Sequence, residues 1–198
     1  MLVFRAEQKN LYWRFITTET TAEVAAGLDV LEQRGYQLKS AVIDGRKGVI
    51  RLFETRYPTL PIQLCQFHQA QIIRRYTTNR PKTDCGQALK CLMSMLTQVD
   101  HEQFSSMLFS LREQYEAFLK ERNEQGQFMH RRLRSAFRSL KTNLPYLFTY
   151  KQFPELNMPN TTNSCDGSFA HWKQKVKIHR GLRHIRRNKM INYLLNKS

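Results

Sequence analysis

The sequence lacks any apolar run that approaches the roughly 18 residues needed to cross a bilayer, which excludes a membrane-spanning helix. The first residues, Met1–Glu7, also lack the charged segment followed by an apolar segment that is typical of a secretory leader. Internal repeats and low-complexity segments are absent too. We therefore expect a soluble globular protein of the cytoplasm that has no membrane partner.

Cysteine is scarce and irregularly spaced. The four cysteines, at positions 65, 85, 91 and 165, do not form the framework of a disulfide-stabilised domain. Because cytoplasmic proteins keep cysteine reduced, we expect thiols and no disulfides.

Acidic residues are outnumbered, with 16 Asp and Glu against 32 Lys and Arg and a net charge of +16. The excess is uneven. Residues 1–120 carry 16 basic and 12 acidic side chains, a net charge of +4, whereas residues 121–198 carry 16 basic and 4 acidic ones, a net charge of +12. A basic half of this kind predicts binding to nucleic acid. A basic surface that only prevents aggregation, or a ribosome-associated protein, is the alternative.

The chain of 198 residues is long enough for one domain with a hydrophobic core and an insertion. Apolar periodicity predicts a hairpin over 2–17, helices over 18–35 and 48–57, and strands over 38–43 and 61–67. Helical signals fill 69–147, with breaks near 79–81 and 123–127, and Pro145 is expected to end the basic helix that starts at Arg131. A loop over 148–162, a helix over 162–178 and a partly helical basic tail follow. This order predicts an α/β sheet interrupted by an all-helical insertion.

Asp44 comes directly after an apolar strand, in the run AVIDGRKG. An acid at the carboxyl end of a strand in an α/β sheet lies where such sheets bind ligands and metals. Carboxylate oxygens are suitable ligands for Mg²⁺ or Mn²⁺. The structural alternative is that Asp44 caps the next helix or shapes the Asp-Gly turn.

Cys65 and His68 form a C-x-x-H pair at the end of the next strand. One such pair is half of a zinc site, and no second pair stands at a matching spacing. A Cys–His catalytic pair is another alternative. We favour a packed thiol and a hydrogen-bonded histidine, because cysteine is frequently buried.

Asp166 is the second acid of interest and follows the polar run NTTNSC, in which Asn163 or Ser164 can cap a helix. A carboxylate in the first turn of that helix interacts well with the helix dipole, which is the structural interpretation. Cations interleaved with aromatics follow in the run FAHWKQKVKIHR, a pattern typical of a metal-dependent site that acts on a phosphate backbone. Two acids far apart in sequence fit two-metal phosphoryl transfer. A convincing third acid is missing among Glu7, Glu19, Glu23, Asp29 and Asp100.

Four segments together resemble bacterial insertion-sequence transposases of the Mutator-like DDE group: AVIDGRKG, LCQFH, RRLRSAFRSLKTNLPYLFTY and PNTTNSCDGSFAHWKQKVKIHRGL. The resemblance covers essentially the whole chain, and the ordered set is more specific than any single motif. It implies an α/β fold with a ribonuclease-H-like sheet core, an all-helical insertion and basic C-terminal helices. The implied division is 1–78 for the first part of the core, 79–158 for the insertion and 159–198 for the last core helix and the basic tail.

The resemblance also implies three acids that hold two Mg²⁺ or Mn²⁺ ions for strand cleavage and strand transfer in DNA transposition. Asp44 matches the second acid, and Asp166 falls on the third, which the family normally fills with the longer Glu. Cys65 and His68 match the C-x-x-H that the group carries between these two acids. The family's first Asp and its amino-terminal DNA-binding region would precede this chain. We therefore expect an amino-terminally truncated fragment with impaired catalysis.

The partners implied by the resemblance are DNA at insertion-element ends and target, in the nucleoid, with the chain acting as a homo-oligomer or beside an intact transposase. The expected contacts to DNA phosphates are eight cations: Arg131, Arg132, Arg134, Arg138, Lys173, Lys175, Lys177 and Arg180. Two alternatives stay open. One is a non-enzymatic DNA-binding remnant, and the other is a structure-selective nuclease on the same ribonuclease-H-like fold.

Overall fold

The computed structural model describes residues 1–7, 9–178, 181 and 183–196, and of residues 163–166, 168, 169, 173 and 184 it describes the backbone alone. The described residues form a mixed α/β protein that is mostly helical and contains two small two-stranded sheets. Contacts between Cα atoms divide the chain into two compact units. Unit 1 comprises Met1–Leu38, Lys47–Pro58 and Thr162–Ser198, and unit 2 comprises Lys39–Arg46 and Thr59–Thr161.

Unit 1 begins with the predicted hairpin, in which β1 (Leu2–Ala6) pairs antiparallel with β2 (Lys9–Arg14). Helix α1 (Thr21–Gln33) packs against both strands. Thr20 caps α1, because its hydroxyl accepts from the N–H of Glu23 at 3.2 Å. The apolar side chains of α1 are spaced along one face and are buried, at Val24, Leu28 and Leu31.

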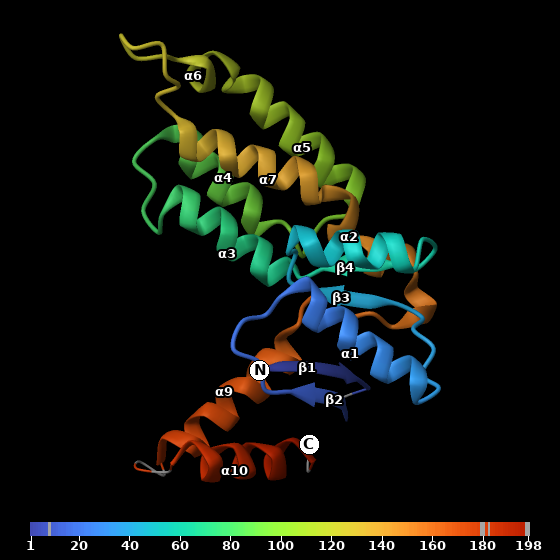
Figure 1. Cartoon of the computed structure of the whole chain (residues 1–198). Helices are drawn as coiled ribbons and strands as arrows, with labels where there is room; N and C mark the ends of the chain where they lie inside the picture. The colour runs from blue at the N-terminus through green and yellow to red at the C-terminus, as the bar shows by residue number, and fades with distance from the viewer. Residues whose placement is uncertain (8, 179–180, 182, 197–198) are drawn as a thin grey trace. The chain divides into compact units, whose positions relative to one another are not determined.

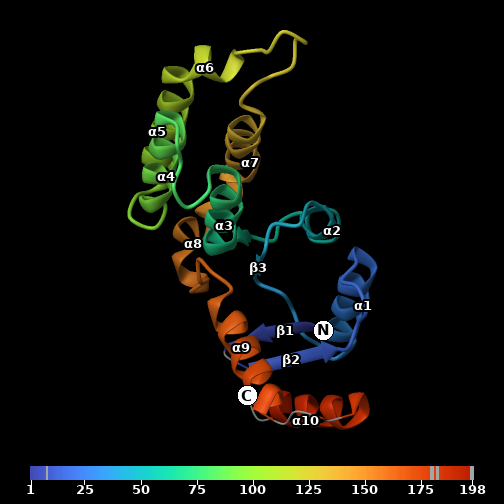
Figure 2. The same cartoon turned by 90° about the vertical axis from the view of Figure 1, so that its left-hand side faces the viewer.

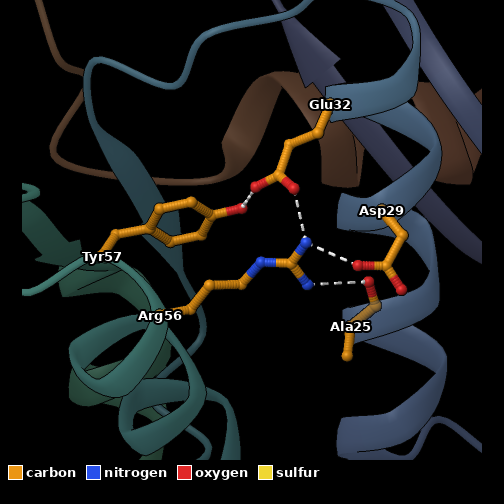
Figure 3. A network of polar contacts seen from close by, with 5 residues as sticks. All are labelled: Ala25, Asp29, Glu32, Arg56 and Tyr57. Atoms are coloured by element: carbon orange, nitrogen blue, oxygen red, sulfur yellow. Dashed lines mark hydrogen bonds and ion pairs between the residues drawn. The ribbon is translucent and has the colours of Figure 1, made fainter.

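Helix α2 (Lys47–Arg56) packs against α1 and is joined to it by a polar network around Arg56 (Figure 3). The guanidinium donates to Asp29 at 2.5 Å, to Glu32 at 2.6 Å and to the carbonyl of Ala25 at 3.4 Å, and the Tyr57 hydroxyl also donates to Glu32. The hydrogen bond from Arg56 lowers the pKa of Glu32, and burial raises the pKa of Tyr57 to about 12. Asp29 and Glu32 therefore serve the packing of α1 on α2.

Replacing Arg56 with methionine is expected to lower the melting temperature by a few degrees, because three acceptors on α1 lose their donor. Part of the difference in melting temperature between Arg56→Met and the wild type should disappear at high salt. Asp29 and Glu32 are about half exposed, with side-chain exposures of 52% and 41%, so salt screens their ion pairs with Arg56. Arg51→Met is the matched control, because Arg51 lies exposed on the same helix. Equal melting temperatures for the two variants would contradict the role given to the network.

The C-terminal part of unit 1 contains α9 (Asn163–Ile178) and α10 (His184–Asn196), in agreement with the predicted last helix and partly helical tail. Helix α10 is hydrogen-bonded to the hairpin. The Asn10 side chain donates to the carbonyl of Leu195, and the Trp13 indole donates to the Asn192 side chain, both at 2.9 Å. Trp172 of α9 is buried as well.

Unit 2 contains β3 (Ala41–Ile43) and β4 (Ile62–Leu64), which pair in parallel with Ile43 opposite Leu64. Between these strands the chain passes through α2. The strand expected over 61–67 is shorter than predicted, because α3 begins at Gln66 and takes the next residues into its first turn. The described strands form two separate pairs, and no larger ribonuclease-H-like sheet is evident among them.

The rest of unit 2 is helical and includes the expected breaks. Helix α3 packs on α4 and α7, and α5 packs on the same two helices, so that the four lie alongside one another (Figures 1 and 2). Buried side chains on these helices, such as Leu89, Phe104 and Leu140, form the core. The helices are α3 (Gln66–Thr77), α4 (Asp84–Ser94), α5 (His101–Gln114), α6 (Glu116–Lys120), α7 (Arg131–Leu147), α8 (Thr149–Gln152) and the 3₁₀ helix η1 (Pro154–Leu156).

Two expectations for this region are wrong. Helix α7 does not end before Pro145 but continues to Leu147. Proline removes one backbone donor, and this costs little near a helix end that buried Leu144 and Leu147 anchor. The loop expected over 148–162 contains α8 and η1.

The predicted division into 1–78, 79–158 and 159–198 stays a prediction. Among the described helices, none has both the length and the apolar character needed to cross a membrane.

Candidate nucleic-acid interface

Asp44 lies where the sequence places it, directly after β3 in the parallel pair β3–β4. Its Oδ1 accepts from the backbone N–H of Arg46 at 3.3 Å, and its Oδ2 lies 3.6 Å from the Arg46 guanidinium. Gly45 between them has a φ of +89°, a conformation that favours glycine. Asp44 therefore shapes the Asp-Gly turn, as the structural alternative states, while its side chain keeps 39% exposure.

Three of the other acids considered as metal ligands, Glu23, Asp29 and Asp100, have structural roles of their own. Glu23 pairs with Arg14 at 3.1 Å, and Asp29 belongs to the Arg56 network. Asp100 caps α5 in a reciprocal capping box with Gln103. These contacts explain the acids without a metal ion.

Asp166 belongs to the first turn of α9. The structure describes its backbone, and its side chain lies outside the described part of the chain. In the described part of the chain, no three His, Cys, Asp or Glu side chains form a group that could hold a metal ion. One carboxylate that faces a guanidinium does not fit a two-metal site, which needs several uncompensated oxygen ligands. The pairing of Asp44 with Asp166 around Mg²⁺ or Mn²⁺ stays a prediction.

Cys65 directly follows β4, at the strand end where the sequence places the pair, and His68 lies in the first turn of α3. Cys65 precedes the first helical residue, is 1% exposed, and its N–H donates to the carbonyl of Ile43 at 2.8 Å. His68 is half-buried, and its ring meets that of Phe67 edge to face, with centroids 6.0 Å apart. These positions agree with a packed thiol and a packed imidazole. A metal-binding role for the pair stays a prediction.

Three buried glutamines, at positions 63, 66 and 69, connect β4 and the first turn of α3 to the end of α7. The side-chain amides of Gln63 and Gln66 both donate to the carbonyl oxygen of Leu147 at 2.9 Å. The Gln63 side chain also accepts from the backbone N–H of Tyr150 at 2.9 Å. Because the last carbonyls of a helix have no partner within it, these amides cap α7.

The network extends along α3 in both directions. Gln69 accepts from the amide of Asn143 at 2.7 Å and donates to Ser139 at 3.3 Å, both on α7. Gln66 accepts from the side chain of Asn160 at 2.9 Å. Sequence reasoning missed this network. The available signal was glutamine at every third position of an otherwise apolar run, since a buried polar side chain needs a partner.

Helix α7 carries the basic residues expected at the nucleic-acid interface. Leu133, Ala136, Phe137 and Leu140 are buried on one face, which leaves the cations to the other positions. Arg131, Arg132, Arg138 and Lys141 are exposed.

The cations of α7 differ in how they are engaged. Arg131 donates to the side chain of Gln127, and Arg132 donates to the carbonyl of Arg75 on α3. Arg134 is half-buried. It donates to the carbonyl of Leu119 at 2.9 Å and lies over the Phe128 ring, 3.5 Å from its centroid. Arg134 therefore packs the start of α7 against its neighbours, and its expected phosphate contact finds no support in this geometry.

Arg138 and Lys141 are the cations of α7 best placed to bind an anion. They are three residues apart and so are neighbours on the helix surface. Both are exposed, and neither has an ion-pair or hydrogen-bond partner among the described residues. Lys141 was not among the predicted contacts, although it belongs to the same basic run.

The cations predicted in α9 are described only in part. Lys177 is exposed and Lys175 is half-buried. The side chain of Lys173 and the whole of Arg180 lie outside the described residues. Their contacts to DNA stay predictions.

Charge is segregated among the helices of unit 2. Helices α3 and α7, which pack on each other, contain no acidic residue. Their cations are Arg74, Arg75, Arg131, Arg132, Arg134, Arg138 and Lys141. Helices α5 and α6 contain three glutamates, and one of them, Glu116, pairs with Lys120 at 2.8 Å. The α3–α7 pair therefore carries seven cations and no acidic residue of its own, which suits a phosphate backbone.

Comparisons of the chain with protein-family models, curated proteins and solved structures find no match. The resemblance to transposases therefore rests on the sequence motifs alone and stays a prediction.

Proposed function

We propose that this chain is a DNA-binding protein related to the catalytic core of Mutator-like DDE transposases. The observation that carries the proposal is the acid-free surface of α3 and α7, with Arg138 and Lys141 exposed and unpartnered among the described residues. Contacts to phosphates supply sequence-independent affinity for DNA. The motifs around Asp44, Cys65 and His68 supply the link to the transposase group.

The finer architecture belongs to the same proposal: a ribonuclease-H-like core with an all-helical insertion. The parallel pair β3–β4, with an acid directly after β3 and a helix between the strands, agrees with part of such a core. The helices from α4 to η1 lie within 79–158, the range predicted for the insertion, and agree with it. The proposed activity is limited to DNA binding, because the Asp44 carboxylate shapes the Asp-Gly turn and lies 3.6 Å from the Arg46 guanidinium.

Asp44→Asn is expected to leave DNA affinity unchanged or to raise it slightly, since it removes one negative charge and keeps the size of the side chain. No nicking of labelled DNA is expected in Mg²⁺ or Mn²⁺, with or without the substitution. Gel-shift and nicking assays on the same preparations measure both properties. Glu124→Gln is the control, because Glu124 is an exposed acid outside the strand ends. Metal-dependent nicking that is lost only in Asp44→Asn would identify a working transposase site.

A further inference from the structure

A cavity of about 290 Å³ lies in unit 2 between α3, the turn that follows it, and α4. Ile73 and Met93 form apolar parts of its wall, and Arg74, Thr77, Asn79 and Lys90 form polar parts. None of the described residues that line it is acidic. Its volume is close to the lower end of the range for small-ligand pockets, which is enough for a phosphate with part of a sugar.

Two cations converge on one residue of this cavity. The Arg74 guanidinium donates through Nε to the side-chain oxygen of Asn79, and the Lys90 ammonium donates to the backbone carbonyl of Asn79 at 2.9 Å. Each cation keeps further donors, because an ammonium has three N–H groups and a guanidinium has five. Asn79 thus holds two positive charges at one site without neutralising either of them.

The backbone at this site is strained. Thr78 has a φ of +70° and a ψ of 173°, a conformation populated almost only by glycine. A β-branched residue is unfavourable in this region, and such strain persists where the surroundings hold it in place. Arg74 helps to hold Thr78 in this conformation, because its backbone carbonyl accepts the N–H of Thr78 at 2.8 Å. The turn is therefore held in a fixed shape beside both cations.

One hydrogen bond links the end of α3 that lines the cavity to α7, the helix whose cations are proposed to bind DNA. Arg132 of α7 donates to the carbonyl of Arg75, the residue that follows Arg74 on α3. This contact brings the basic first turn of α7 to the end of α3 that lines the cavity.

We propose that this cavity binds one phosphate group of the DNA backbone, with Arg74 and Lys90 as its cationic contacts. The inference rests on the proposed function and adds a fixed anchoring point to it. Arg74 and Lys90 are themselves exposed, but their hydrogen bonds to Asn79 position them before binding, so that less side-chain freedom is lost. A free phosphate ion presents the same anionic oxygens as a phosphate of the DNA backbone. The experiments below distinguish these two ligands.

Duplex affinity measured over a range of salt concentrations tests the proposal. Lys90→Gln is expected to weaken binding severalfold and to reduce the slope of log K against log salt by about 1, as the loss of one phosphate contact does. Lys90→Arg should keep the wild-type slope. Lys120→Gln, an exposed lysine of α6, should change neither quantity. Equal effects of Lys90→Gln and Lys120→Gln would overturn the anchoring site and leave the proposed function standing, whereas salt-independent binding by the wild type would overturn the proposed function itself.

Amide NMR spectra of the wild-type chain give a second test that requires no substitution. A short duplex should shift the amide signals of Thr78 and Asn79, and inorganic phosphate should shift the same signals at much higher concentration. Signals that move with inorganic phosphate and stay in place with the duplex would assign the cavity to a free phosphate and overturn the proposal. Signals that stay in place with both ligands would overturn it as well.

Discussion

Replacing Gln63 with leucine is expected to lower the free energy of unfolding by about 2–4 kcal/mol. Gln63 is fully buried, and its side chain donates to the carbonyl of Leu147 and accepts from the N–H of Tyr150. Leucine has a similar size, so the loss comes from polar groups left without partners and not from a cavity. Gln66 still donates to Leu147, which leaves the N–H of Tyr150 as the main unsatisfied group.

Urea unfolding followed by circular dichroism measures this effect. Gln114→Leu is the matched control, because Gln114 is exposed at the end of α5 and should change stability by less than about 0.5 kcal/mol. Two variants of equal stability would contradict the role of Gln63 as the cap of α7.

Replacing Arg138 and Lys141 together with glutamine is expected to weaken duplex binding about tenfold or more at moderate salt. The slope of log K against log salt should fall by about 2, because each phosphate contact contributes about 0.9. Both side chains are exposed and lie on the acid-free α3–α7 surface, so the loss should be the same for different DNA sequences.

Arg112→Gln with Lys120→Gln is the control for this pair of substitutions. It removes the same net charge from α5 and α6, which also carry glutamates. A general effect of net charge would weaken binding equally in both double variants, and that result would contradict a localised surface.

Arg134→Gln is expected to act differently and to lower stability more than affinity, because Arg134 binds the carbonyl of Leu119.

Local sequence signals predict much of the secondary structure. The hairpin, the Thr20 cap and the buried face of α1 follow from residues close together in the chain. The start of α3 does not. The apolar run from Pro61 to Phe67 looks like one strand, yet it changes to a helix at Gln66, where contacts with Leu147 and Asn160, more than 80 residues away, satisfy the polar side chain.

The candidate site shows the same division between local and distant information. The position of Asp44 after a strand follows from its neighbours, and so does its part in the turn. The distribution of cations on α7 follows from the period of its apolar residues. The engagement of Arg132 and Arg134 depends on α3 and on residues 119 and 128, whose positions relative to α7 are set by tertiary packing. The cavity beside Thr78 depends in the same way on the approach of α4 to α3.

Titration of the wild-type chain with a short duplex at increasing salt tests the proposed function most directly. Several phosphate contacts on the α3–α7 surface predict an affinity that falls about 100-fold or more between about 50 and 200 mM salt. The logarithm of the binding constant should fall linearly with log salt, with the same slope for different DNA sequences. Affinity that does not change with salt, or the absence of binding at low salt, would contradict a DNA-binding role for these helices.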